Sequence, residues 1–261
     1  MGMEGIMTDS HGLTVIARIH TRYPAKFGVP RQPGLADALT AEIRFEPPFR
    51  NADAVRGLEG FEYIWLIWGF DLNERETWSP TVRPPILGGT QRVGVFATRS
   101  SFRPNSLGLS SVKLLAIDPH GKYAEGESGP VLTVAGADMV DGTPIYDIKP
   151  YIASWDAHPQ ASEGWREGVA WPELKVEIPS SELGKIPTEL HEGLLQLLRQ
   201  DPRPAYTRTG QEDRVFWVPL GPYAIRFTVT GSHLSVIGID TLTPAQQQEL
   251  QKTGSIRDYD K

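Results

Sequence analysis

The 261-residue sequence contains no cysteine, which excludes disulfide bonds, thiolate metal sites and cysteine nucleophiles. It also lacks any apolar run of the roughly 18 residues that a membrane-spanning helix needs. The first residues show no basic stretch followed by an apolar one, so no secretory signal is expected. These absences predict a cytoplasmic protein that does not enter a membrane.

Helical periodicity is absent between residue 13 and about residue 149, which argues against a parallel sheet whose strands alternate with helices. Short β-type runs between Gly, Pro, Asn and Asp turns occur there instead. The predicted strands are residues 13–20, 41–45, 63–70, 92–98, 109–117, 131–137 and 144–149. Many strands without crossover helices favour an antiparallel barrel or sandwich. Because the run 63–70 is apolar on both faces, we expect it in the centre of the core.

The last third of the chain has a different pattern. Four leucines share one face of a helix predicted over residues 187–200: Leu190, Leu194, Leu197 and Leu198. A three-stranded meander is predicted at residues 214–220, 223–230 and 233–239. Thr243-Pro244 with Gln246 predicts the cap of a final helix that ends near Gly254.

These patterns predict a mainly β protein with an added α+β part. We expect an antiparallel β-barrel domain over residues 12–157 and a small α+β domain over residues 174–261. Residues 154–173 have no period and are interpreted as an excursion and linker.

Acidic residues are missing from one long segment of an otherwise acidic chain. The net charge is −6, so general attraction to nucleic acid is not expected. From Thr77 to Ile117, however, 41 residues hold no Asp or Glu, where an average stretch would hold about five. Four arginines lie there among glycines and prolines: Arg83, Arg92, Arg99 and Arg103. Such groups suit an anionic ligand, and the alternative is surface arginines paired with distant carboxylates.

Several catalytic motifs are absent as well. The chain has no G-x-G, so the phosphate-binding turn of dinucleotide folds is excluded. It has no G-x-S-x-G, which leaves a Ser–His–Asp hydrolase unsupported. None of the six histidines is paired at helical i, i+4 spacing, and we expect no metal site.

Five motifs, in order along the chain, carry a resemblance to a known family. They are residues 26–35 (KFGVPRQPGL), 82–89 (VRPPILGG), 94–105 (GVFATRSSFRPN), 140–151 (VDGTPIYDIKPY) and 201–206 (DPRPAY). Together they closely resemble the TrmO family, also called YaeB or TsaA-like proteins, strongly over residues 13–157 and weakly over residues 174–240. The resemblance implies a β-barrel methyltransferase that uses S-adenosylmethionine to methylate N6 of threonylcarbamoyl-adenosine beside the tRNA anticodon. It also implies a homodimer in which the barrel binds the cofactor and carries the chemistry, while the domain at residues 174–261 recognises the tRNA.

The resemblance also implies which residues contact the cofactor. They are Pro30, Arg31, Gln32, Asp71, Leu72, Arg99, Leu109, Ala135, Gly136, Ala137 and Asp138. The guanidinium of Arg99 would hold the cofactor's carboxylate in a bidentate manner. Plain core packing is the alternative for Leu109, and capping of a turn is the alternative for Asp138. Asp71 and Tyr63 stand where relatives carry His, which puts the side-chain role of both positions in doubt.

Methyl transfer to N6 requires a proton to leave, and the lone pair of this nitrogen is delocalised into a carbonyl group. A positioned proton acceptor should therefore help. Asp138 and Asp141 are the candidates, and if neither acts as the base, positioning alone carries the rate.

Further residues are assigned to the substrate. Arg83, Arg103 and Asn105 would bind tRNA phosphates or the threonyl carboxylate if they face outward, and would pair with Asp138, Asp141 or Asp147 if they face inward. Phe102, Tyr206 and Trp217 are candidates to stack on an anticodon base, with core packing as the alternative.

Two other functions remain open at the level of sequence. One is a barrel that binds S-adenosylmethionine or RNA without catalysis, and the other is methylation of a different small acceptor. Transfer of labelled methyl to tRNA separates the first from an enzyme, and tRNA without threonylcarbamoyl separates the second.

Overall fold

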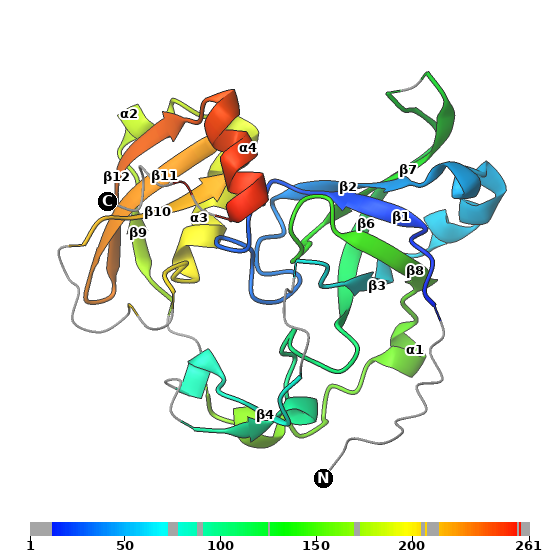
Figure 1. Cartoon of the computed structure of the whole chain (residues 1–261), viewed down its shortest axis with the longest axis horizontal. Coiled ribbons are helices and arrows are strands. Elements are labelled where there is room, and N and C mark those ends of the chain that lie inside the picture. Colours follow the sequence, from blue (N-terminus) through cyan, green and yellow to red (C-terminus); the bar gives the residue numbers. More distant parts are fainter. Residues whose placement is uncertain are drawn as a thin grey trace, which may run out of the picture.

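The computed structural model describes residues 12–72, 78–87, 91–124, 126–169, 173–204, 207, 214–254 and 256. Its larger sheet is a closed barrel of six strands in the order β1-β2-β7-β6-β3-β8, and every neighbouring pair is antiparallel. The strands are β1 (Ala17–His20), β2 (Thr40–Phe45), β3 (Tyr63–Gly69), β6 (Leu107–Lys122), β7 (Ser128–Ala135) and β8 (Pro144–Pro150). The predicted antiparallel barrel is thus confirmed (Figure 1).

Alternation along each strand fills the barrel. The fully buried side chains include Ile19, Ile43, Ile64, Leu66, Leu132 and Ile145. The expectation that residues 63–70 are central on both faces is wrong, because β3 buries only alternate residues through most of its length. On its outer face, Tyr63 is 38% exposed and Trp65 packs against Tyr151 with ring centroids 5.5 Å apart. A single barrel has one interior, so the other face of an apolar strand must be covered by a connection.

The predicted strand at residues 92–98 is also wrong. Only β5 (Val93–Gly94) is extended there, and it pairs with β4 (Thr81–Val82) outside the barrel. The chain then turns into η5 (Val95–Ala97). The carbonyl of Val95 accepts bonds from the amide and hydroxyl of Thr98 and from the guanidinium of Arg103, so it is occupied locally and cannot join a sheet.

The two ends of the barrel are formed by different connections. One end, here called the mouth, is formed by the described parts of residues 21–39, 70–106 and 136–143, which follow β1, β3 and β7. The far end carries three short helices that the sequence analysis did not predict: η1 (Pro47–Phe49), η2 (Ala52–Val55) and η3 (Leu58–Gly60). They cover a cavity of about 570 Å³ whose apolar lining includes Ile16, Phe45, Phe49, Val55, Leu58 and Phe61.

The second sheet lies beside the barrel, and we call it with its helices the second module (Figure 1). The predicted meander is present as β10 (Phe216–Leu220), β11 (Tyr223–Thr230) and β12 (His233–Thr241). The short β9 (Lys175–Glu177), which was not predicted, lies parallel to β12. The predicted helices are present as η7 (Thr188–Leu190) with α3 (His191–Arg199), and as α4 (Pro244–Thr253) with the expected capping box. A further short helix is α2 (Ser180–Leu183).

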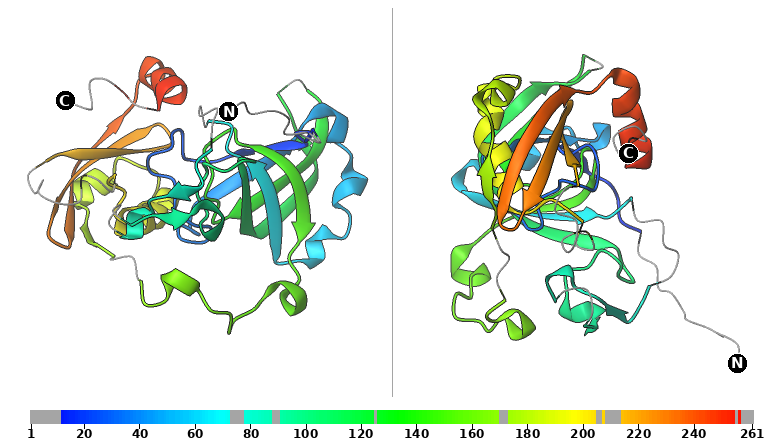
Figure 2. Two further views of the ribbon diagram at one scale, coloured as in Figure 1. Left: turned by 60° about the horizontal axis from the view of Figure 1, so that its bottom comes forward. Right: turned by 90° about the vertical axis from the view of Figure 1, so that its left-hand side faces the viewer.

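The connection between the two sheets runs along the outside of the molecule (Figure 2). It contains α1 (Ala153–Asp156) and η6 (Gly164–Arg166). The indole nitrogen of Trp165 donates to the carbonyl of Ala97 at 2.8 Å, which ties this connection to η5. A further short helix, η4 (Pro85–Leu87), follows β4. No helix among the described residues is both long and apolar enough to cross a membrane.

Residues 21–39 join the two parts of the molecule through a shared core. Tyr23, Ala36 and Leu39 belong to the same buried cluster as the leucines of α3 and the inner face of the meander. The contact is tight, because a Cβ atom at Gly193 of α3 would lie 2.3 Å from Leu39. The proposed division at residues 157 and 174 follows the two sheets, but the core of the second module includes part of the mouth.

Candidate functional site

The topology gathers the predicted cofactor residues at the mouth. Strands β1, β3 and β7 run in the same direction, so the connections that follow them leave the same end of the barrel. These connections carry residues 30–32, 71–72 and 99, and the end of β7 leads into residues 135–138. Segments far apart in the sequence therefore meet in one place.

Polar contacts connect three of these segments. The guanidinium of Arg99 donates to the side-chain oxygen of Gln32 at 2.5 Å. The side-chain nitrogen of Gln32 in turn donates to the backbone carbonyl of Arg31 at 2.5 Å. The ammonium group of Lys26 donates to the carbonyl of Leu72 at 2.5 Å. Residues 26–32 thus contact both the turn after β3, at Leu72, and the loop that precedes β6, at Arg99.

Among the described carboxyl groups at the mouth, Asp138 has a pKa raised clearly above its ordinary value. Its Oδ1 accepts a hydrogen bond from the hydroxyl of Ser110 at 2.6 Å, and that hydroxyl accepts one from the indole nitrogen of Trp68 at 3.0 Å. Burial raises the pKa of Asp138 to about 6, although the Ser110 bond and the positive charge of Arg99 act in the opposite direction. Asp138 can therefore both accept and release a proton near neutral pH.

The hydroxyl of Tyr23 lies buried close enough to Asp138 to feel its charge. Tyr23 is 2% exposed, and its hydroxyl has no hydrogen-bond partner within the described part of the chain. Burial, and then the negative charge of Asp138, raise the pKa of this hydroxyl far above its usual value, so it stays protonated. A buried donor without a partner is uncommon in folded proteins and is a group that a bound molecule can satisfy.

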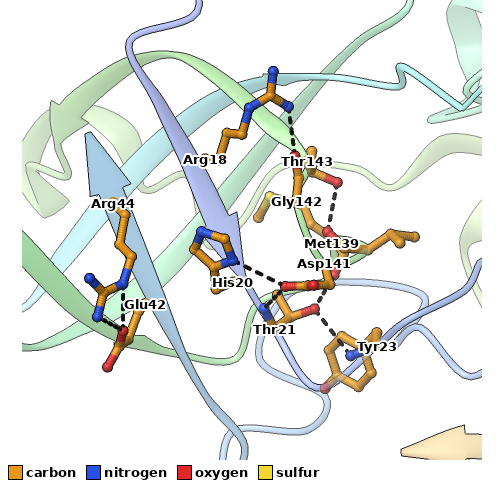
Figure 3. Close-up of polar contacts among 11 residues, drawn as sticks. Arg18, His20, Thr21, Tyr23, Glu42, Arg44, Met139, Asp141, Gly142 and Thr143 are labelled. Carbon is orange, nitrogen blue, oxygen red and sulfur yellow. Dashed lines mark hydrogen bonds and ion pairs between the residues drawn. The ribbon is translucent and has the colours of Figure 1, made fainter. Parts of the chain in front are cut away.

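Asp141, the second candidate base, has a different environment. Its Oδ1 accepts from the backbone amide of Thr21 at 3.0 Å and lies 3.5 Å from Nδ1 of His20 (Figure 3). Its own amide donates to the carbonyl of Tyr23, and the hydroxyl of Thr21 donates to the carbonyl of Met139. Asp141 therefore holds the end of β1 against the loop before β8, whereas the carboxyl group of Asp138 is bonded to Ser110 of β6.

The small residues near Asp138 accommodate the chain itself. Gly136 has a φ of +75°, and a Cβ atom there would lie 2.9 Å from the Cα of Gly34. The amide of Gly34 donates to the carbonyl of Gly136 at 2.9 Å, and Ala135 and Ala137 are buried. The lack of a side chain at Gly136 lets Gly34 approach the end of β7 closely.

Leu109 and Ser110 point to opposite faces of β6. Leu109 is 58% exposed on the outer face of the barrel, and Ser110 is 1% exposed on the inner face. Of the other predicted cofactor residues, Pro30 is buried, Arg31 and Gln32 are half-buried, and Asp71, Leu72 and Arg99 are exposed. Ser110, Trp68 and Tyr23 were missed, and strand alternation from Leu109 was the available signal for Ser110.

The predicted substrate residues are dispersed in role. Arg103 donates to the carbonyls of Thr98 at 2.6 Å and Val95 at 3.2 Å, and so supports the loop that carries Arg99. Arg83 is exposed, and Asn105 is exposed within the turn that leads into β6. Phe102 and Trp217 are half-buried, while Tyr206 lies outside the described residues. Over the described residues, no three His, Asp or Glu side chains group as a metal site.

Comparisons with known proteins agree on one family. The family model described as the tRNA-methyltransferase O N-terminal domain matches residues 18–157, and the TrmO C-terminal domain matches residues 171–242. An Escherichia coli (strain K12) protein named tRNA (adenine(37)-N6)-methyltransferase is 37% identical over 231 residues, which are 86% of this chain and 96% of that protein.

Two further comparisons involve Pseudomonas aeruginosa. A protein of strain PAO1 named putative S-adenosylmethionine-dependent methyltransferase RcsF is 36% identical over 205 residues, 76% of this chain and 84% of that protein. A crystal structure described as TrmO from this organism aligns with a TM-score of 0.70 at 28% identity, and covers 91% of this chain and all of that one. The similarity therefore extends over both sheets.

Proposed function

The chain belongs to the tRNA-methyltransferase O (TrmO) family, and from this premise we propose that it methylates N6 of threonylcarbamoyl-adenosine 37 in tRNA with S-adenosylmethionine as donor. The observation that carries the proposal is the buried carboxyl group of Asp138 at the mouth, which accepts a hydrogen bond from Ser110 and has its pKa raised to about 6, with the positive charge of Arg99 acting on it. A fixed cation and a carboxyl group that titrates near neutrality are the groups that this reaction requires from the protein.

The donor set at the mouth fits S-adenosylmethionine. The guanidinium of Arg99 suits the carboxylate of its methionyl part, and the carboxylates of Asp71 and Asp138 suit its ammonium and sulfonium charges. The buried hydroxyl of Tyr23, which has no partner among the described residues, offers a further hydrogen bond. When bound, S-adenosylmethionine supplies an electrophilic methyl group.

The residues of the chain then have distinct tasks. Asp138, ionised, accepts the proton that leaves N6 as the new nitrogen–carbon bond forms. Ser110 and Trp68 hold its carboxylate in one orientation through consecutive hydrogen bonds. The Ser110 hydrogen bond, and to a smaller extent the charge of Arg99, lower the pKa of Asp138 and so favour its ionised form at neutral pH despite burial. Gln32 fixes the guanidinium of Arg99, so that the binding group is already oriented before a ligand arrives.

A homodimer in the cytoplasm is part of the same proposal. The outer face of β6 exposes Leu107 at 37% and Leu109 at 58%, and a second copy of the chain would cover such a surface. Contact of Leu109 with the cofactor would then involve this outer face. Sedimentation of the wild type and of L109E tests the assembly, since a charge on a dimer surface should produce monomers.

The decisive experiment uses purified protein, labelled S-adenosylmethionine and total tRNA from cells that lack this gene. We expect label only in tRNA that carries threonylcarbamoyl-adenosine, and none in tRNA from cells that cannot make this modification. Equal labelling of both pools would overturn the substrate assignment. Cofactor binding without any labelling would make the protein a binder.

A further inference from the structure

A buried ion pair in the second module lies next to the mouth. Arg203 contacts Asp201 through two bonds, Nε to Oδ1 at 2.8 Å and a terminal nitrogen to Oδ2 at 3.0 Å. Asp201 is 3% exposed and Arg203 is 9% exposed. Asp201 also has a φ of 52°. Among the described residues it is the only residue other than glycine with a positive φ. Such a conformation in a buried residue is maintained by its surroundings.

The backbone of Asp201 is bound to a residue of the mouth. The guanidinium of Arg31 donates to the carbonyl of Asp201 at 2.5 Å. The carbonyl of Arg31 accepts from Gln32, and Gln32 accepts from Arg99, whose charge acts on Asp138. A series of hydrogen bonds therefore leads from the buried pair to Arg99, and the charge of Arg99 acts on the carboxyl group assigned as the base.

The rest of the same loop is held by α3. Gln196 donates to the carboxylate of Asp37 at 2.7 Å and accepts from the amide of Ala38 at 3.0 Å. Gln200 donates to the carbonyl of Leu35 at 3.1 Å. The loop of residues 21–39 is thus held by the barrel before and after residues 30–32, through Lys26 and Gly34. The second module holds it through Gln196 and Gln200.

We propose that the Asp201–Arg203 pair is a positioning unit for cofactor binding: it fixes the carbonyl that orients Arg31, and through Gln32 it orients Arg99. The second module then sets the affinity for S-adenosylmethionine in the absence of tRNA, in addition to any contact it makes with tRNA. This inference rests on the proposed function of the mouth.

The test compares two Arg→Lys variants of the full-length protein. R203K keeps the charge but removes the two-point contact with Asp201, because an ammonium group cannot reproduce the planar fork. R226K is the matched control, since Arg226 of β11 pairs with Asp240 of β12 at 2.8 Å, in the same module but at a half-exposed position. Calorimetry with S-adenosylmethionine alone should show about tenfold weaker binding for R203K and an unchanged Kd for R226K.

A second readout distinguishes positioning from simple loss of structure. If Arg99 moves away from Asp138, the pH midpoint of methyl transfer should rise for R203K and stay constant for R226K, while the KM for tRNA stays within twofold of wild type for both. An unchanged Kd for S-adenosylmethionine with a raised KM for tRNA would overturn the inference.

D201N gives an independent test if R203K does not fold. Asn tolerates positive φ and keeps the backbone carbonyl, but it lacks the charge that pairs with Arg203. We expect the same weakening of cofactor binding, and equal affinity in a folded D201N would contradict the inference. If wild type itself does not bind S-adenosylmethionine, the proposed function fails; if wild type binds and the variants bind equally, only the positioning role fails.

Discussion

At the far end of the barrel, three short helices cover an apolar cavity of about 570 Å³, whereas at the mouth the connections meet in a chain of charged and polar side chains. The lining of this cavity is mostly hydrocarbon. The mouth contains the carboxyl group with the raised pKa, the guanidinium of Arg99 whose charge acts on it, and the buried hydroxyl that has no partner among the described residues. We therefore assign the proposed chemistry to the mouth, where side chains can transfer a proton and hold charge, and not to the end with the cavity.

The two aspartates at the mouth repeat this contrast on a smaller scale. Asp138 and Asp141 are three residues apart, yet one is a buried carboxyl group with a raised pKa and the other accepts from the amide of Thr21. Substitution of a reactive group at the mouth should therefore lower the rate of methyl transfer and leave the fold intact. Substitution at the far end should lower the free energy of unfolding and leave the rate unchanged.

The largest effect is expected for D138N. Asn cannot accept the proton from N6, and loss of a general base lowers single-turnover methyl transfer by about 10²- to 10⁴-fold. Ser110 can still donate to the amide oxygen, so the fold should remain intact. D141N is the matched comparison and should lose stability while transfer changes less than fivefold. Equal rates for D138N and wild type would remove Asp138 from the mechanism.

The next effect concerns pH. Because the pKa of Asp138 is about 6, the rate should rise with pH as this acid ionises and should level off above pH 7. The Ser110 hydrogen bond lowers this pKa, so S110A should move the midpoint upward by about one pH unit. Rates measured between pH 5 and pH 8 with saturating cofactor test this. A downward shift would contradict the assigned hydrogen bond.

A smaller effect is expected for Y23F. Removal of a buried hydroxyl that lacks a partner in the chain should leave the free energy of unfolding unchanged or slightly higher. If the hydroxyl pairs with the bound cofactor, the Kd for S-adenosylmethionine should rise about three- to tenfold, which corresponds to one hydrogen bond. Calorimetry and urea unfolding of the same sample measure both quantities. Weaker folding with unchanged binding would assign Tyr23 to the core alone.

The smallest effect on catalysis is expected at the far end. V55A removes two buried methyl groups next to the cavity and should lower the free energy of unfolding by about 1–2 kcal/mol. Methyl transfer and cofactor binding should not change, because the far end contributes no group to the mouth. A rate loss larger than the stability loss would show that the two ends are coupled.

Much of the barrel was predictable because alternation of apolar and polar residues is a local property. Strands such as β2 and β7 lie within three residues of their predicted ends. The failure at residues 92–98 has a different origin, since local sequence cannot reveal that the carbonyl of Val95 is taken by Arg103. The helices η1 to η3 were missed because each is a single short turn stabilised by its place over the barrel end.

The candidate site was predictable only in part. The resemblance to a family indicated Arg99 and Asp138, and the topology brings both to one end of the barrel. Ser110 and Trp68 depend on the register of β3 against β6, which places Gly108 opposite Trp68 and Ser110 on the inner face. Tyr23 and Asp201 depend on how residues 21–39 pack against α3, and no short-range pattern encodes that contact.

The shared core also bears on the order in which the protein is synthesised. Tyr23, Ala36 and Leu39 leave the ribosome long before the leucines of α3 against which they pack. The six barrel strands can close as soon as β8 has emerged, but the segment with Arg31 and Gln32 has its apolar side uncovered until the carboxyl-terminal half arrives. A nascent chain stopped at the linker would contain a closed barrel but an incomplete ligand site. The proposed ability to bind S-adenosylmethionine would therefore be acquired last.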